Sequence, residues 1–420
     1  MIHNRPLTGY TTNTRRANVY QSAPQDIGQF FERLRSSQAI PFSHDSYMAL
    51  SKGQQDDLKD VGGFVLGELR GGRRKAGAVL SRCAAVLDAD TLGPGETDGV
   101  VRRMEALGCC YCIYSTAKHS PDAPRLRIVI PFSEDITADE YEPVTRLLCQ
   151  MIQPEMTWFD PSTAEPSRMM YYPAHCQDIA PVYYAGDKPL PDARVLLSRL
   201  QDWQDATSWP RFPQEQTPAR LAAKQGDPET KHGVVGAFCR VYDVPAAMDK
   251  FLPGVYEEAD TPGRYTFTGG STTGGAVLYD GGKFLYSHHA TDPCGGKLVN
   301  AFDLVRLHCF GDKDDEAAHG ARGNGLPSYG AMCELAVADE AVSALLDQEK
   351  QAEIAEAFSP VGGAPVDASW LHGLKRNSKG GFEHTSANFA HVLENDPMLK
   401  GRLYYDSFAE QMLGVSPLPW

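Results

Sequence analysis

The sequence predicts a mixed α/β fold, of the α+β kind, built around a ferredoxin-like sheet. Three observations predict it. An apolar strand is expected over residues 79–87, and two more strands over residues 109–115 and 126–131. Helical segments follow the first strand, over residues 97–107, and the third strand, over residues 137–152. Two successive strand–helix–strand units are what a ferredoxin-like sheet requires.

Helix signals support this order. Residues 26–36 are expected to form a helix ahead of the sheet. Thr137 and Glu140 have the spacing of a capping box at the start of the helix over residues 137–152. The chain of 420 residues is long enough for two or three domains, and we expect the first over residues 1–203.

A second module is predicted after a linker over residues 204–230, where several prolines interrupt any long periodicity. Residues 231–346 are expected to form a small accessory α+β domain. Its predicted elements are helices over residues 231–250 and 301–309, the second capped by Asn300, and a three-stranded meander over residues 265–267, 276–279 and 283–287.

Two carboxylates stand at the end of the first apolar strand. Asp88 and Asp90 are separated by one residue, so in an extended chain their side chains point to the same face. A buried strand rarely ends in two unpaired carboxylates without a cation, and Mg²⁺ prefers carboxylate oxygens, waters and substrate phosphates. The alternative is a solvated loop, because Asp-x-Asp is a common pattern.

The hairpin between the second and third strands collects groups that bind phosphate. Ser115, Thr116 and His119 can donate hydrogen bonds from its first half. Arg125 and Arg127 share a face of its second half and are spaced as a fork for phosphate oxygens.

A third carboxylate, Asp160, follows an aromatic pair, and Arg168 lies shortly beyond it. Three acids, one histidine and several arginines are the groups that two-metal phosphoryl or nucleotidyl transfer requires. In that chemistry two metals contact the attacking and leaving oxygens, and cations hold the triphosphate.

These motifs, in this order, resemble the archaeo-eukaryotic primase superfamily. The order is Asp-x-Asp at 88–90, Ser-Thr-x-x-His at 115–119, Pro-Arg-x-Arg at 124–127 and Phe-Asp at 159–160. More narrowly, the chain resembles the primase-polymerases of phages, prophages and mobile islands, which often carry a helicase domain of the virulence-associated protein E type. The resemblance spans roughly residues 50–420. One departure is the serine-to-histidine spacing, which is wider than the usual Ser-x-His, so Thr116 or Ala117 takes the place of the usual serine.

The resemblance implies a template-dependent DNA primase-polymerase. Residues 1–203 would hold an RNA-recognition-motif-like catalytic core with a second α/β subdomain, and the substrates would be a single-stranded DNA template and ribo- or deoxyribonucleoside triphosphates. Residues 367–420 resemble the segment that precedes the helicase domain in relatives. Because no G-x-x-x-x-G-K-[ST] occurs in the sequence, a helicase is expected in cis beyond this segment or in trans as a separate protein.

The resemblance also implies a role for each candidate residue. Asp88, Asp90 and Asp160 would hold two Mg²⁺ or Mn²⁺ ions. The predicted nucleotide-binding residues are Ser115, Thr116, His119, Arg125, Arg127 and Arg168.

The net charge of −14 requires any DNA-binding surface to be local. The best candidate is a glycine-bearing basic turn just before the first strand, whose amides and guanidiniums could contact phosphates. Its basic residues are Arg70, Arg73, Arg74 and Lys75. A solvated basic loop is the alternative.

Other features exclude classes of protein. No apolar stretch of about 18 residues occurs, the N-terminus lacks the apolar core of a signal peptide, and the ten cysteines form no regular framework. A bacterial host cytosol is therefore expected, with no membrane partner. Cys109 and Cys112 form a C-x-x-C inside an apolar strand, where core packing is expected. No zinc is expected around His288 and His289, because no C-x-x-C lies nearby.

Two alternatives of other classes stay open. One is a catalytically weak DNA-binding replication-initiator scaffold, in which the acidic cluster only orders a loop. The other is a nuclease or a non-templated nucleotidyltransferase that uses the same metals. The intact acids and His119 favour an enzyme over a scaffold, and product length with and without template separates a polymerase from a transferase.

Overall fold

The computed structural model describes residues 1–75, 77–215, 218–317, 321–357, 369–377, 381–397, 399–406 and 411–414. The chain groups into two compact units. The first contains Met1–Leu221, Pro253–Tyr279 and Tyr286–Leu298, and the second contains Ala222–Leu252, Asp280–Leu285 and Val299–Trp420. Parts of the expected linker, accessory domain and C-terminal segment lie outside the described residues, at 216–217, 318–320, 367–368, 378–380, 398, 407–410 and 415–420.

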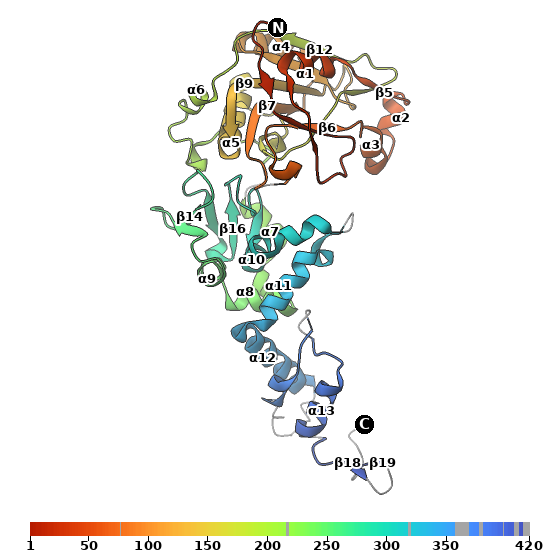
Figure 1. Ribbon diagram of the computed structural model, residues 1–420, viewed down its shortest axis with the longest axis vertical. Coiled ribbons are helices and arrows are strands. Elements are labelled where there is room, and N and C mark those ends of the chain that lie inside the picture. Colours follow the sequence, from red (N-terminus) through yellow and green to blue (C-terminus); the bar gives the residue numbers. More distant parts are fainter. Residues whose placement is uncertain are drawn as a thin grey trace. The chain divides into compact units, whose positions relative to one another are not determined.

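The central sheet of the first unit has four strands in the order β12-β8-β9-β7, and each neighbouring pair is antiparallel (Figure 1). The strands are β7 (Ser81–Ala89), β8 (Tyr111–Ser115), β9 (Leu126–Thr137) and β12 (Tyr183–Gly186). Helix α4 (Glu96–Leu107) connects β7 to β8, and α5 (Ala138–Ile152) follows β9. The predicted mixed α+β fold is confirmed, with β9 between the two strands of a β–α–β unit.

In a ferredoxin-like sheet the fourth strand pairs with the first. In this sheet the fourth strand, β12, lies at the opposite edge. Here β12 pairs with β8. Side chains satisfy the outer edge of β7 instead, because the amides of Asp88 and Val86 donate to the hydroxyls of Thr163 and Tyr141 at 2.7 and 3.5 Å. These hydroxyls take the place of a strand at that edge.

The predicted helix starts are present in the structure. The Thr137 hydroxyl accepts a hydrogen bond from the Glu140 amide, and the Glu140 carboxylate accepts one from the Thr137 amide at 2.7 Å. Helix α1 (Ile27–Arg35) begins with the same arrangement between Asp26 and Gln29. Each box satisfies amides that the first helical turn leaves without partners.

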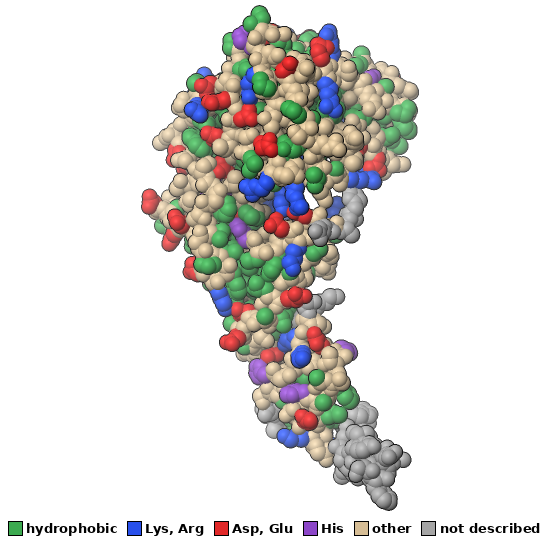
Figure 2. All heavy atoms as spheres, in the orientation of Figure 1, with side chains coloured by type: hydrophobic (Ala, Val, Ile, Leu, Met, Phe, Trp, Pro, Cys, Tyr) green, Lys and Arg blue, Asp and Glu red, His purple; other side chains and the backbone are tan. Residues whose placement is uncertain are grey.

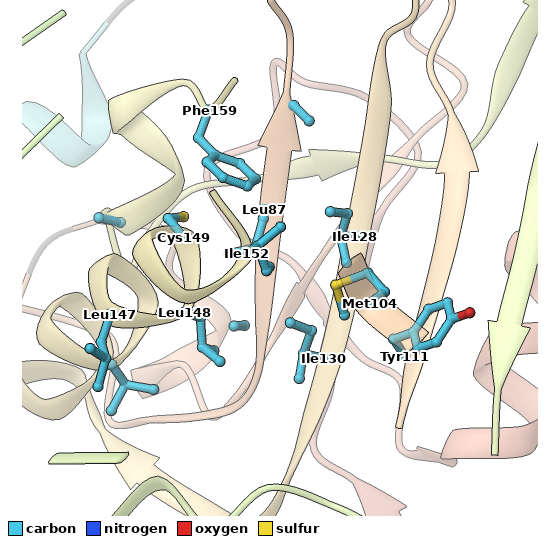
Figure 3. Packing of buried hydrophobic residues seen from close by; sticks show 14 of the residues in the cluster. Leu87, Met104, Tyr111, Ile128, Ile130, Leu147, Leu148, Cys149, Ile152 and Phe159 are labelled. Atoms are coloured by element: carbon cyan, nitrogen blue, oxygen red, sulfur yellow. The ribbon is translucent and has the colours of Figure 1, made fainter. Parts of the chain in front are cut away.

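Both faces of the central sheet are buried. Leu87 of β7 and Ile128 and Ile130 of β9 pack against α4 and α5, where Figure 3 shows Leu148 and Ile152 facing the strands. The alternate positions of β7 enter a second core cluster that contains α1. The C-x-x-C follows the same alternation, because Cys109 lies in the first cluster and Cys112 in the second, both as buried free thiols.

The first unit also contains the smaller sheets of its N-terminal part. Four strands pair in the order β10-β6-β2-β3, and two further pairs are β1–β4 and the parallel β5–β11. Their bounds are β1 Pro6–Leu7, β2 Gly9–Thr12, β3 Gln21–Ser22, β4 Gln25–Asp26, β5 Gln38–Ile40, β6 Gly63–Leu66, β10 Met170–Tyr171 and β11 Ala174–Cys176. The helices beside them are α2 (His44–Met48) and α3 (Lys52–Leu58), whereas α6 (Ala193–Leu197) packs with α5 in the core cluster of the central sheet.

Part of the expected linker packs on the core of the central sheet. Phe212 is only 2% exposed and lies in the same cluster as the apolar residues of α5. Arg146 of α5 donates to the Pro210 carbonyl at 3.1 Å and pairs with Glu215 at 2.5 Å. These residues therefore belong structurally to the first unit.

The predicted meander belongs to a sheet of five strands in the order β13-β14-β15-β16-β17. The strands are β13 Tyr256–Glu258, β14 Arg264–Phe267, β15 Ala276–Tyr279, β16 Phe284–Ser287 and β17 Leu298–Asn300. In the turn before β16, Asp280 and Gly281 have φ values of 52° and 66°, the left-handed region in which glycine and aspartate are enriched. The three predicted strands are confirmed, and β13 and β17 are additional.

The remaining helices are α7 Pro218–Gln225, α8 Gly233–Val241, α9 Val244–Phe251, α10 Ala301–Phe310, α11 Pro327–Ala338, α12 Glu340–Ala357 and α13 Ser386–Asn395. The Asn300 side chain caps α10 through the Asp303 amide, as predicted. β18 (Leu403–Asp406) and β19 (Gln411–Gly414) form an antiparallel pair. Within the described ranges, no helix is both long enough and apolar enough to cross a membrane.

Candidate active site

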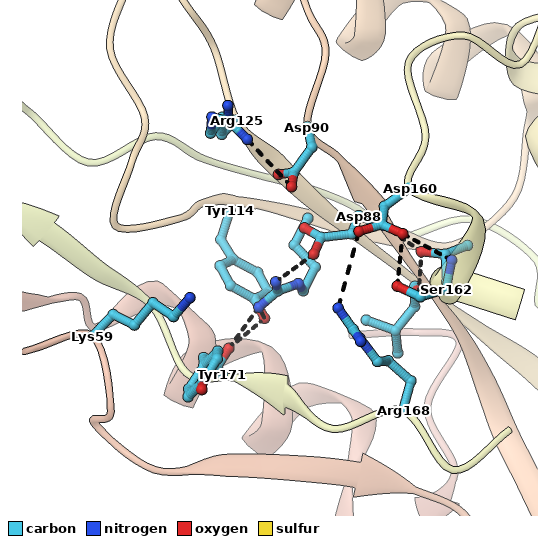
Figure 4. A network of polar contacts seen from close by, with 12 residues as sticks. Lys59, Asp88, Asp90, Tyr114, Arg125, Asp160, Ser162, Arg168 and Tyr171 are labelled. Carbon is cyan, nitrogen blue, oxygen red and sulfur yellow. Dashed lines mark hydrogen bonds and ion pairs between the residues drawn. The ribbon is translucent and has the colours of Figure 1, made fainter. Parts of the chain in front are cut away.

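Three carboxylates meet at the end of β7. Asp88 lies in the strand and Asp90 just after it, while Asp160 begins a short 3₁₀ turn at Pro161–Ala164 (Figure 4). The Asp160 amide donates to the Asp88 carbonyl at 2.9 Å, and Ala89 forms a β-bridge with Phe159. The backbone therefore fixes the distant Asp160 beside the pair that the sequence placed on one strand face.

Each carboxylate has one oxygen held by a neighbouring group. Asp88 Oδ2 lies 2.9 Å from Arg127 Nη2, and Asp90 Oδ2 lies 3.2 Å from Arg125 Nη1. Asp160 Oδ1 accepts from the amide and hydroxyl of Ser162 at 2.8 and 2.7 Å. The β7–β9 register explains the first pair, because Asp88 is directly opposite Arg127.

The second oxygen of Asp88 is the clearest indication of a metal site. Asp88 Oδ1 is buried and has no hydrogen-bond partner among the described residues. A buried anionic oxygen without a partner is unfavourable, and a cluster of three carboxylates supplies the hard oxygen ligands that Mg²⁺ and Mn²⁺ prefer. The donor set therefore fits divalent cations.

Burial and a neighbouring negative charge both shift the pKa of Asp90. Burial raises the pKa of Asp90, and the nearby Asp88 carboxylate raises it further, while Arg125 and Arg127 oppose the shift. Like charges held close together disfavour ionisation of both groups. A divalent cation between the carboxylates would relieve that repulsion.

A pocket of about 420 Å³ opens beside the carboxylates and is lined by eight basic and four acidic side chains. Four of the basic residues were not predicted as site residues: Arg15, Lys52, Lys59 and Lys118. On the face drawn in Figure 2, Lys and Arg side chains are interspersed with Asp and Glu. The positive charge gathered in the pocket is thus a local feature of a chain with net charge −14.

Sequence signals for these four basic residues differ. Lys118 lies inside the hairpin already singled out, and Lys59 is the first residue of the Lys59-Asp60-Val61-Gly62-Gly63 segment, which the resemblance covers. Arg15 and Lys52 belong to no recognised motif. The packing of the N-terminal sheets and of α3 brings them to the pocket, so no signal in the sequence indicates them.

The predicted phosphate ligands separate into two groups. Thr116, Arg125, Arg127 and Arg168 line the pocket. Ser115 does not, because its buried hydroxyl accepts from the Val182 amide at 2.9 Å and joins β8 to the chain before β12. Arg127 also lines the pocket, but its guanidinium already pairs with Asp88 and the residue is only 6% exposed.

His119 lies behind the pocket wall. Its Nδ1 accepts a hydrogen bond from the Arg125 amide at 3.1 Å, which assigns the proton of the neutral ring to Nε2. Burial lowers the pKa of His119, and the nearby His44 lowers it further, so the neutral form is favoured. The ring is 5% exposed and is not among the residues that line the pocket. The structure therefore places His119 where it supports the hairpin that carries Arg125.

The basic turn is only partly directed at the pocket. Arg74 lines it, whereas Arg70 and Arg73 are exposed elsewhere on the turn, and Lys75 is half-buried. Gly72 has φ 69°, and a Cβ at that position would lie 2.4 Å from the Tyr20 carbonyl oxygen, so glycine is required there. The turn therefore packs closely against the backbone at Tyr20, whose amide donates to the Gly72 carbonyl at 2.8 Å.

Comparisons with known proteins identify the family. No curated protein matches the chain. A structural comparison finds a likeness to the AEP domain of the cyanophage S-2L primase-polymerase (PrimPol), at 13% identity over 46% of this chain and 87% of that one. The TM-score of that likeness is 0.26. The family model described as the VapE N-terminal domain matches residues 1–212, half of the chain. The chain therefore belongs to the VapE N-terminal domain family, which confirms the relationship that its motifs predicted.

Proposed function

We propose that this protein is a template-dependent DNA primase-polymerase that makes and extends primers by two-metal nucleotidyl transfer. The observation that carries the proposal is the buried Oδ1 of Asp88, which has no hydrogen-bond partner in the described part of the chain and lies in a cluster of three carboxylates at the edge of a strongly basic pocket. Membership of the VapE N-terminal domain family supports it. Carboxylates for metals and cations for a triphosphate are the two requirements of this chemistry.

The reaction joins the 3′-oxygen of one nucleotide to the α-phosphorus of the next. That bond forms as the bond from the α-phosphorus to pyrophosphate breaks, and the hydroxyl proton leaves to a carboxylate or to water. Mg²⁺ or Mn²⁺, when bound, would lower the pKa of the attacking hydroxyl and neutralise the leaving phosphates. Asp88, Asp90 and Asp160 would hold two such ions, and Arg125, Arg127 and Ser162 orient the carboxylates from behind.

The basic wall of the pocket would hold the incoming triphosphate. Lys118 is suited to this role because burial lowers its pKa, with Lys59 and Arg125 adding to the effect, so an anionic ligand would relieve unfavourable positive charge. Arg168 lies 4.0 Å from Asp160 and could contact either the phosphates or the template. Thr116 lines the same wall, and His119 would act by supporting the hairpin.

Several further assignments belong to the same proposal. The template would contact the turn that carries Arg70, Arg73, Arg74 and Lys75. Residues 1–203 would be the catalytic domain, 204–230 a linker whose first part packs on the first unit, 231–346 an accessory domain and 367–420 the segment that leads to a helicase. The process would be replication of a phage or other mobile element in a bacterial cytosol, with a helicase in cis or in trans.

The experiment that tests the proposal is incubation with single-stranded templates, labelled nucleotides and Mn²⁺ or Mg²⁺, with and without a primer. Products whose length and sequence follow the template are expected from the wild-type chain and not from Asp88→Asn. Products that form without any template would indicate a non-templated transferase. Degradation of the template would indicate a nuclease, and template binding without any product a scaffold.

A further inference from the structure

A second pocket lies next to the carboxylates within the first unit. It has a volume of about 540 Å³, and Asp160 lines both this pocket and the basic one. The turn residues Ser162 and Glu165 also line it. A ligand in the second pocket would therefore lie beside the reacting atoms, yet outside the basic wall.

Aromatic side chains form much of the second pocket. The Trp209 and His288 ring centroids are 6.2 Å apart, and those of Tyr286 and His288 are 4.7 Å apart. Tyr279 and Phe212 complete the aromatic lining. Flat rings that border a cavity are surfaces on which nucleobases stack.

Three of these rings keep hydrogen-bonding groups available. Among the described residues, no hydrogen bond is formed by the hydroxyls of Tyr279 and Tyr286 or by the imidazole of His288, and none of these atoms is sealed in the core. Burial lowers the pKa of His288 to about 3, with Arg146 and Arg211 adding to the shift, so the ring is neutral. The pocket thus offers uncharged donors and acceptors beside its aromatic surfaces.

The lining of the second pocket has four carboxylates, of Glu142, Asp160, Glu165 and Glu215, against two guanidiniums, so it lacks the positive charge that a triphosphate requires. Arg146 pairs with Glu142 at 2.7 Å and with Glu215 at 2.5 Å, and its guanidinium lies 5.2 Å from the Phe212 ring centroid. Arg211 is the one other basic residue in the lining. The basic pocket, with eight cations, suits a triphosphate, whereas this one suits an uncharged planar group.

We propose that the second pocket holds the 3′-terminal nucleobase of the acceptor strand, the nucleotide whose hydroxyl attacks. This inference rests on the proposed function and assigns a substrate to the other side of the same carboxylates. Nucleotidyl transfer needs two nucleotides at one metal site, and only one of them brings a triphosphate to be broken. The basic pocket takes that nucleotide, and the aromatic pocket that shares Asp160 with it takes the other.

The test uses the full chain and single-stranded DNA that carries 2-aminopurine, a base whose fluorescence falls when it stacks. We expect quenching when the reporter is the 3′-terminal base and little when it lies several nucleotides inside the strand. Tyr279→Leu and His288→Ala should each weaken binding of the 3′-terminal reporter about tenfold, the order expected for loss of one base–aromatic stack. Tyr279→Phe keeps the ring and should retain the quenching.

The matched control is Tyr184→Ala, which removes an exposed tyrosine of β12 outside both pockets. It should leave the titration unchanged, and circular dichroism should confirm that all variants fold. Equal quenching for terminal and internal reporters, or wild-type binding by both Tyr279→Leu and His288→Ala, would overturn the proposal. Because Tyr279→Leu and His288→Ala change different elements, misfolding of one leaves the other to decide.

The outcome is separable from that of the proposed function. Asp88→Asn should abolish synthesis but keep the 3′-terminal quenching, because Asp88 does not line the second pocket. A wild-type chain that makes no product would contradict the polymerase assignment while the fluorescence titration still decides whether the pocket binds a terminal base. Templated synthesis together with quenching that is insensitive to the pocket variants would contradict the pocket assignment alone.

Discussion

The amide of Asp88 donates a hydrogen bond of 2.7 Å to Oγ1 of Thr163, a residue that is fully buried. The Thr163 amide in turn donates to the Asp160 carbonyl at 3.0 Å, and the Tyr141 hydroxyl donates to the Thr163 carbonyl at 3.3 Å. One threonine therefore joins the two segments that carry the carboxylates. It does so at the edge of β7 where a ferredoxin-like sheet would have a strand.

Thr163→Val should weaken metal binding although Thr163 is not one of the proposed metal ligands. The substitution keeps the side-chain shape but leaves the buried Asp88 amide without a partner, which costs about 1–3 kcal/mol of unfolding free energy. We expect weaker Mn²⁺ binding by calorimetry together with a lower melting temperature. Thr163→Ser keeps the hydroxyl and should restore Mn²⁺ affinity. Equal Mn²⁺ affinity in the valine and serine variants would show that the hydrogen bond does not position Asp88.

Asp88→Asn and Asp90→Asn should each abolish synthesis, but they should differ in stability. The Asp88–Arg127 pair is buried, with side chains 10% and 7% exposed, whereas the Asp90–Arg125 pair is 34% and 31% exposed. Loss of a hydrogen bond between buried charged groups costs about 1.5–3 kcal/mol, whereas a half-buried pair that solvent still reaches contributes about 0–1 kcal/mol. Denaturant unfolding should therefore find only Asp88→Asn clearly destabilised. Near-normal extension by either folded variant would contradict the metal assignment.

As the pH is lowered, Mn²⁺ affinity should be lost with a midpoint at a higher pH than a carboxylate of ordinary pKa would give. Burial and Asp88 raise the pKa of Asp90, and a protonated Asp90 cannot bind a cation well. Arg125→Gln removes an opposing charge and should move the Mn²⁺-binding midpoint to still higher pH. The same raised pKa means that the folded state binds more protons than the unfolded state. The stability contributed by this group is therefore full at pH values below the unfolded pKa and is lost as pH rises through the folded pKa. A midpoint unchanged in Arg125→Gln would show that another group governs the titration.

His119→Ala should weaken nucleotide binding more than template binding. His119 Nδ1 holds the Arg125 amide, so its loss disturbs the hairpin that faces the basic pocket. This hydrogen bond joins two uncharged groups, so its loss should cost about 0.5–1.5 kcal/mol, which reaches nucleotide binding indirectly through the hairpin. Arg73→Ala in the exposed turn is the matched variant, expected to weaken template binding instead. A collapse of template affinity with unchanged nucleotide affinity in His119→Ala would mean that the residue serves the template.

The sequence by itself determined the features that depend on neighbouring residues. The two-residue period of a strand placed Asp88 and Asp90 on one face, and the Thr137–Glu140 spacing predicted the start of α5. Family motifs marked Asp160 as a third acid, although no local pattern linked it to the strand. Strand alternation and helix capping depend on residues only a few positions apart, so a short stretch of sequence is enough to predict them.

Only the tertiary structure decided which of these residues share a site and what each one contacts. Register across β7 and β9 set Arg127 against Asp88, so a residue predicted to bind phosphate also pairs with a carboxylate. Packing directs the Ser115 hydroxyl to the Val182 amide. It also places Arg15 in the lining of the basic pocket, although no sequence motif includes Arg15. These outcomes depend on contacts between segments far apart in the chain, whose geometry is fixed by core packing and strand register and has no counterpart in local spacing.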